Sequence, residues 1–135
     1  LSLVQGIKEG LIDVIVSDHL PEDEESKRLP FAQAATGAIG VETLLPLSLE
    51  MYHNESLPLN KIIETLTINP SNILKIKKGS LSKGSDGDIC IFDLEAPWAV
   101  KGEDLKSKSK NTAIEGRNLQ GKVLMTFLNG ELVFS

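Results

Sequence analysis

The side chain best placed for chemistry in this sequence is Asp18, which lies two residues beyond an apolar run at residues 11–16. The run is nearly continuous and rich in β-branched residues, a pattern that predicts a strand buried on both faces, as in a parallel sheet. The carboxyl ends of such strands carry the active-site groups of α/β barrels. A carboxylate there can bind a metal ion or transfer a proton to a leaving nitrogen. The alternative is that Asp18 only forms a turn at the strand end.

Other polar residues give weaker signals. His19 follows Asp18, and because adjacent side chains on a strand point to opposite faces, we expect it to support the site or pack rather than to bind metal. His53 is expected at the surface or at a helix C-terminus. The acidic run 22–25 predicts a solvated loop, with a mobile lid as the alternative. The polar stretch 107–112 has no nearby histidine to activate its serines and predicts a structural loop.

Helices are expected over the first half of the chain. Apolar spacing predicts one helix before Gly10, one along the stripe from Val41 to Tyr52, and one at residues 59–66. Pro46 predicts either a kink or a later start of the second helix. Asn69 and Pro70 are expected as the N-cap and first residue of a further short helix.

The second half of the chain changes to a strand pattern from about Gly79 onward. A short strand is expected between Asp88 and Asp93, with Cys90 buried inside it. Residues 123–134 predict a hairpin, because the Asn129-Gly130 pair favours a type I′ turn. The chain is therefore predicted to have an α/β part at residues 1–78 and a small all-β part at residues 79–135. A buried parallel strand needs parallel neighbours, and residues 1–78 offer only one, which indicates a fragment of a larger sheet.

Composition narrows the class of protein. The 135 residues are 41% hydrophobic and 24% charged, typical of a globular cytosolic protein, but too few for a complete barrel of roughly 250 residues. A net charge of −5 argues against nucleic acid and anionic membranes as partners. No apolar stretch approaches the roughly 18 residues of a membrane span, and no secretory signal is visible. A single cysteine excludes an internal disulfide.

Several motifs resemble the dihydroorotase family of amidohydrolases, and together they cover essentially the whole chain. Residues 13–21 (DVIVSDHLP) resemble the family's last barrel strand, D-x-I-A-T-D-H-A-P, and residues 26–35 resemble the loop that follows it. Residues 37–46 (GAIGVETLLP) are similar to G-x-x-G-x-E-T-x-L-P. Smaller matches lie at residues 67–70, 79–88 and 98–100. Residues 107–112 (SKSKNT) resemble S-K-S-x-N-T, which favours dihydroorotase over its hydantoinase and allantoinase relatives.

The resemblance implies the C-terminal part of a (β/α)8 barrel, at residues 1–78, and part of a small β-sandwich, at residues 79–135. It implies reversible cyclisation of N-carbamoyl-L-aspartate to dihydroorotate, in pyrimidine synthesis, on a zinc centre. Asp18 then matches the metal-binding aspartate that is also the general acid/base, and Thr36 and Gly37 match the pair whose backbone contacts substrate. A homo-oligomer or an association with aspartate carbamoyltransferase is the implied kind of assembly.

Two departures from the family pattern affect these expectations. Glu22 stands where many members have a substrate-binding histidine, and because a carboxylate would repel an anionic substrate, we expect Glu22 to point away. Thr36 also differs from the usual residue, which matters less for a backbone contact. The family's histidine ligands have no counterpart here, so the 135 residues alone are expected to retain no zinc and to be inactive.

Two other functions remain open from the sequence. The parent protein could be a catalytically silent dihydroorotase-like partner that only scaffolds aspartate carbamoyltransferase. Alternatively, the chain could be a free-standing interaction domain that binds a partner through exposed sheet edges.

Overall fold

The computed structural model describes residues 2–135, with helices in the first part and strands in the second. The elements, in chain order, are α1 (Leu3–Lys8), α2 (Glu24–Lys27), α3 (Leu44–His53), α4 (Leu59–Leu66), α5 (Ile68–Leu74), β1 (Ile89–Ala99), η1 (Gly102–Asp104), β2 (Asn118–Leu128) and β3 (Glu131–Phe134). The α/β class predicted from the sequence is therefore confirmed. No helix within residues 2–135 has the length and apolar character needed to cross a membrane.

The three strands form one antiparallel sheet in the order β1-β2-β3. Asn129 and Gly130 connect β2 to β3 with φ angles of 52° and 82°, the left-handed pair that a type I′ turn requires, so the predicted hairpin is confirmed. β1 is longer than expected because the strand continues through Pro97, beyond an irregularity in its register with β2. The Trp98 indole nitrogen donates to the Gly121 carbonyl at 3.0 Å, which adds a cross-strand bond near that irregularity.

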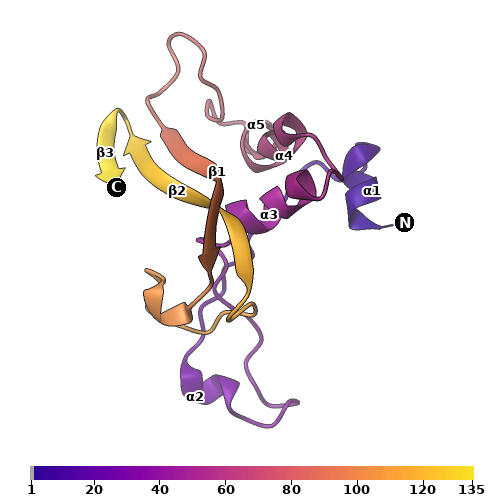
Figure 1. The fold of residues 1–135 in the computed structure, drawn as a ribbon, viewed down its shortest axis with the longest axis vertical. Coiled ribbons are helices and arrows are strands. Elements are labelled where there is room, and N and C mark those ends of the chain that lie inside the picture. The colour runs from indigo at the N-terminus through magenta and orange to yellow at the C-terminus, as the bar shows by residue number, and fades with distance from the viewer. Residues whose placement is uncertain (1) are drawn as a thin grey trace.

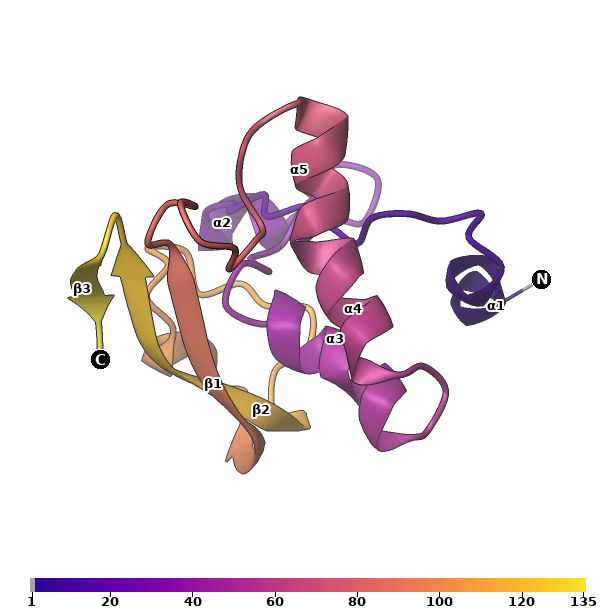
Figure 2. The same cartoon turned by 90° about the horizontal axis from the view of Figure 1, so that it is seen from above.

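Helix α3 packs on the sheet through a close contact with β2. Figure 2 shows α3 between the strands and the α4–α5 pair. Leu49 of α3 is fully buried, and a Cβ added at Gly121 of β2 would lie 2.6 Å from its Cδ1 atom. Gly121 also has a φ of 103°, so a glycine at this position meets both a steric and a conformational need. A neighbouring apolar cluster joins the sheet to the loops around it: Ile39, Val100, Leu105 and Leu119.

A second apolar cluster holds the helices together. Its buried members are Ile7 of α1, Leu57 before α4 and Ile62 of α4, with Ile12 and Ile15 packed partly against them. Helix α4 falls where its apolar spacing predicts, and α1 ends shortly before Gly10, as expected. Figure 1 shows α1 at the opposite side of the helical layer from the sheet, joined to the rest by an extended segment.

The prediction of a buried strand at residues 11–16 was wrong, because this extended segment is exposed and belongs to no sheet in the described part of the chain. Leu11 and Val16 have exposed fractions of 68% and 71%. The backbone bonds at isolated points. The Leu11 and Ile12 N–H groups donate to the Gly6 carbonyl at the end of α1, the Ile15 N–H donates to the Thr65 carbonyl, and the Asn69 side chain donates to the Asp13 carbonyl. A strand needs a neighbouring strand on which to form its hydrogen bonds, and none pairs with this segment within residues 2–135.

The starts of two helices and the burial of one cysteine also differ from the predictions, although a later start of the second helix was one of the two alternatives given for Pro46. Helix α5 begins at Ile68 with Thr67 at its N-cap, so Pro70 is its third residue, still within the first turn that tolerates proline. Helix α3 begins at Leu44, the later start that Pro46 allows, and leaves Val41 outside the helix and 58% exposed. Cys90 is exposed rather than buried, in a part of β1 where its neighbours Ile89 and Ile91, on the other face, are also exposed. Partial desolvation raises the pKa of its thiol, which disfavours the reactive thiolate.

Candidate functional site

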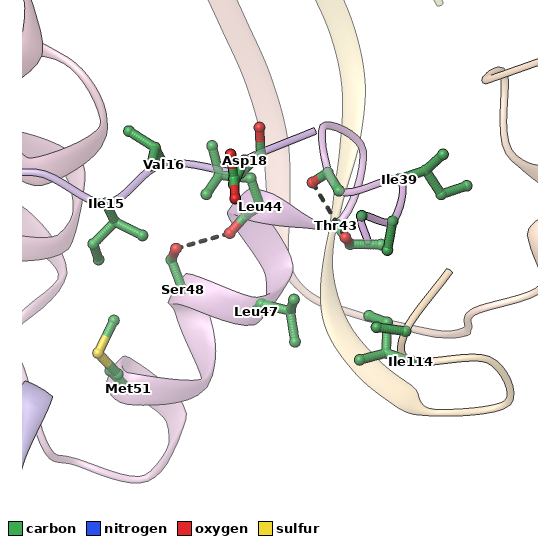
Figure 3. A pocket seen from close by; sticks show the side chains of 15 residues that line it. Ile15, Val16, Asp18, Ile39, Thr43, Leu44, Leu47, Ser48, Met51 and Ile114 are labelled. Carbon is green, nitrogen blue, oxygen red and sulfur yellow. Dashed lines mark hydrogen bonds between the residues drawn. The ribbon is translucent and has the colours of Figure 1, made fainter. Parts of the chain in front are cut away.

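Asp18 and Gly37 line the same cavity, although they lie on different segments. The cavity has a volume of about 540 Å³ and is lined by residues 15–18, residues 37–40, the first two turns of α3 and the 113–114 loop. Figure 3 shows the Asp18 side chain at the first turn of α3, above the hydrogen bond between the Ser48 hydroxyl and the Leu44 carbonyl. Apolar side chains such as Leu47 and Met51 form most of the walls. Asp18 itself is exposed to solvent where it lines this cavity, so its carboxylate is accessible to a ligand.

Asp18 has an unusual backbone conformation. Its φ of 44° lies in the left-handed region, which few residues other than glycine, asparagine and aspartate adopt readily. This angle turns the chain sharply between Ser17 and His19. Such conformations are often found at functional sites, where surrounding contacts hold them in place.

His19 provides one of those contacts. Its Nδ1 atom accepts hydrogen bonds from the Gly40 N–H at 3.0 Å and from the Val41 N–H at 3.3 Å. Nδ1 must therefore carry no proton, which leaves Nε2 as the protonated nitrogen of the neutral ring. The imidazole thus ties the Asp18 segment to the loop before α3, in agreement with the supporting role predicted for it.

The loop at residues 36–40 lies directly against the Asp18 segment. The Leu20 N–H donates to the Ala38 carbonyl at 3.0 Å. A Cβ added at Gly37 would lie 2.7 Å from the Leu20 carbonyl oxygen, and one at Gly40 would lie 2.8 Å from that of Ser17. Glycine at both positions therefore permits this close approach. Thr36 precedes Gly37 in the loop but is not among the residues that line the cavity.

Glu22 faces a different cleft. This second cleft, of about 810 Å³, lies between residues 21–27 and residues 102–115. The Ser109 hydroxyl donates to the Glu22 carbonyl at 2.6 Å and joins its two sides. Glu22 lines this cleft and not the Asp18 cavity, as its charge led us to expect.

The acidic run is partly helical, which corrects the prediction of a simple loop. Asp23 caps α2 by accepting from the Ser26 N–H at 2.8 Å. This backbone hydrogen bond lowers the pKa of the Asp23 carboxyl group.

His53 is the last residue of α3, which agrees with the expected place at a helix C-terminus, and it is half-buried rather than at the surface. Its ring packs edge-on against Tyr52, with centroids 5.3 Å apart. Its Nε2 atom is buried and has no hydrogen-bond partner within residues 2–135. His53 lines neither cavity.

Two residues that sequence reasoning missed contact the Gly37 carbonyl. Lys27 of α2 and Asn111 of the 107–112 loop both donate to it. They lie 10 and 74 residues from Gly37, so local patterns could not connect them. The only signal for Asn111 was its place in the S-K-S-x-N-T resemblance.

The metal-binding capacity of these residues is limited. No group of three or more histidine, cysteine, aspartate or glutamate side chains comes together within residues 2–135. A catalytic zinc ion usually needs about three protein ligands. Asp18 can supply one carboxylate, and the described residues alone therefore do not fit a zinc ion.

Comparison with known proteins defines the class. The chain belongs to the amidohydrolase family, whose model matches residues 2–133. Among individual sequences, it is similar to the dihydroorotase of Ehrlichia chaffeensis, with 42% identity over 99% of this chain and 30% of that protein. The dihydroorotase of Aquifex aeolicus is 41% identical over 99% of this chain and 32% of its own length. The chain thus spans about a third or less of the curated relatives it matches.

Solved structures show the same relationship. The L-hydantoinase (dihydropyrimidinase) of Arthrobacter aurescens superposes with a TM-score of 0.87 at 32% identity, covering 98% of this chain and 31% of that one. The dihydropyrimidinase of Brevibacillus agri has a TM-score of 0.92 at 22% identity, over 98% of this chain and 30% of its own, which supports the fold alone. The prediction of a partial amidohydrolase fold is therefore confirmed.

Proposed function

We propose that this chain is part of a dihydroorotase, which interconverts N-carbamoyl-L-aspartate and dihydroorotate in pyrimidine biosynthesis. The observation that carries the proposal is the shared cavity of Asp18 and Gly37, in a chain whose sequence is about 42% identical to dihydroorotases along its whole length. The dihydroorotase of Ehrlichia chaffeensis is 42% identical to this chain, whereas the L-hydantoinase of Arthrobacter aurescens is 32% identical over a similar span, and this difference favours the dihydroorotase activity.

Asp18 is proposed as the general acid/base. In the hydrolytic direction, water adds to the ring carbonyl carbon and gives up a proton to Asp18. The carbon–nitrogen bond then breaks, and Asp18 passes this proton to the departing nitrogen. In the cyclising direction, Asp18 accepts the proton that this nitrogen loses. The backbone of Thr36 and Gly37, held against residues 17–20, would contact the substrate.

The remaining features are proposed on the same basis. Residues 1–78 would belong to a barrel and residues 79–135 to a β-sandwich of a larger cytoplasmic enzyme. If the enzyme uses zinc, Asp18 would be one ligand, and the others would have to come from outside the described residues.

Replacement of Asp18 tests the proposal. Asp18→Asn in the full-length protein removes the proton-transferring group but keeps the side-chain size, so we expect dihydroorotase turnover to fall at least about a thousandfold. Asp104→Asn, in the exposed η1 turn outside both cavities, is the matched control and should retain activity. Turnover should be followed in both directions by absorbance of the dihydroorotate ring.

Near-normal activity of Asp18→Asn would remove Asp18 from the mechanism. A wild-type full-length protein with no turnover would instead support the silent scaffold partner.

A further inference from the structure

The carbonyl groups on both sides of Thr36 are held by side chains from elsewhere in the chain. The Lys27 ammonium group donates to the Ala35 carbonyl at 2.6 Å and to the Gly37 carbonyl at 3.0 Å. The Asn111 side-chain amide donates to the same Gly37 carbonyl at 3.2 Å. Lys27 belongs to α2 and Asn111 to the loop after η1, two segments that Figure 1 shows at the same end of the molecule.

These bonds fix the loop but leave its central peptide free. Within residues 2–135, no hydrogen bond involves the backbone N–H or carbonyl of Thr36 or the N–H of Gly37. The peptide group is planar, so holding the Ala35 carbonyl also fixes the direction of the Thr36 N–H, which belongs to the same peptide. The bonds to the Ala35 and Gly37 carbonyls together limit rotation of the Thr36–Gly37 peptide between them. The free groups are therefore held in a defined orientation and remain available to a ligand.

The Gly37 backbone needs such support. Its φ of 119° is accessible mainly to glycine, whose backbone has many alternative conformations. A charge-assisted bond from Lys27 is stronger than a neutral one and favours one of these conformations.

Asn111 is itself held in place. Its carbonyl accepts from the Ile39 N–H at 2.9 Å, two residues beyond Gly37. The neighbouring Ser109 hydroxyl binds the Glu22 carbonyl at 2.6 Å. The 107–112 loop therefore contacts both the segment that leads into α2 and the Gly37 loop, and it is more than a surface connection.

We propose that Lys27 and Asn111 are positioning residues that together hold the Thr36–Gly37 backbone in the conformation that binds substrate. The claim that this backbone binds substrate rests on the proposed function. The claim that Lys27 and Asn111 hold the loop does not. Neither side chain needs to touch the substrate, because each acts through the Gly37 carbonyl.

The test uses Lys27→Met and Asn111→Leu in the full-length protein, which remove the donors with little change in size. We expect each variant to raise KM for dihydroorotate about tenfold, equivalent to the loss of roughly one hydrogen bond, while kcat changes less than about threefold. Lys27→Arg, which keeps a charged donor, should restore much of the wild-type KM. Lys110→Met is the matched control, because Lys110 also binds two carbonyls, those of Glu103 and Leu105, but not the Gly37 loop.

Amide hydrogen exchange separates the support of the loop from the catalytic function. The Leu20 and Ile39 amides bond to the Ala38 and Asn111 carbonyls, and we expect them to exchange about tenfold faster in Lys27→Met and Asn111→Leu but not in Lys110→Met. Unchanged exchange in both variants would overturn the inference. Faster exchange with unchanged KM would overturn its substrate part. If the wild-type protein had no dihydroorotase activity, the proposed function would fail, but the exchange rates would still decide whether the loop is held in this way.

Discussion

The sheet with α3 and the segment at residues 11–20 differ in where their contacts come from. The sheet forms its hydrogen bonds between its own strands, and α3 covers one face through Leu49. Residues 11–20 form no regular element and expose apolar side chains. They depend on isolated bonds to Gly6, Thr65, Asn69 and the loop at residues 38–41. The residue proposed for chemistry lies in the second region. Its geometry is thus set by distant parts of the chain rather than by local structure.

The largest expected effect is a loss of stability that tests the difference in burial between Leu49 of α3 and Leu11. In the 135-residue chain, Leu49→Ala should lower the free energy of unfolding by about 3 kcal/mol, because it removes a fully buried side chain. Leu11→Ala removes a side chain that is 68% exposed and should cost less than about 0.5 kcal/mol. Denaturant unfolding of both variants measures the contrast.

The same two substitutions, Leu49→Ala and Leu11→Ala, can also be compared in the full-length protein. If residues 11–16 gain neighbouring strands there, the cost of Leu11→Ala should rise toward that of Leu49→Ala. Equal costs in the 135-residue chain would show that the two regions do not differ in this way.

A smaller loss of stability is expected when His19, which links the two regions, is replaced. His19→Asn places an oxygen near the position of Nδ1 and can still accept from the Gly40 and Val41 amides. His19→Gln places its oxygen near the position of Nε2 and cannot. We expect His19→Gln to lower the free energy of unfolding by about 1 kcal/mol and His19→Asn by less than about half of that. Thermal unfolding of both variants makes the comparison, and equal losses would contradict the acceptor role of Nδ1.

The smallest expected effect is a dependence on pH at the edge of the sheet. The Asn129 N–H and then the Lys78 ammonium group lower the pKa of the Asp88 carboxyl group below 3.8. A lowered folded-state pKa gives a contribution to stability that is present above about pH 3.8 and is lost as the pH falls through the folded value. Both side chains are partly exposed, with exposed fractions of 38% for Lys78 and 28% for Asp88, so solvent screening keeps the effect small.

Denaturant unfolding between neutral and acid pH measures this contribution. Asp88→Asn should unfold with a smaller loss of stability on acidification than the wild type. Asp93→Asn, which changes a carboxylate on β1, serves as a control, and an identical acid response in all three proteins would contradict the assignment.

The sequence predictions were more accurate for the sheet than for the segment at residues 11–20. The hairpin was predictable because its information is local: two residues, Asn129 and Gly130, specify the turn. The conformation of residues 11–16 was not predictable, because an apolar run indicates that a strand would have to be buried between neighbours. It does not indicate whether those neighbouring strands are present. Asp18 could be selected from its place after that run, and its partner Gly37 only through the resemblance. Lys27 and Asn111 were missed because their role depends on contacts between distant segments.

The absence of a side chain at Gly121 also limits which substitutions this protein can accept as it evolves. The helix α3 approaches β2 through the space that a methyl group would occupy, only 2.6 Å from Leu49. Positions 49 and 121 therefore cannot vary independently: a larger residue on the strand requires a smaller one on the helix, and still leaves an unfavourable backbone angle. A mutational survey of this chain should find that the two sites are tolerant only in combination, although they lie far apart in the sequence.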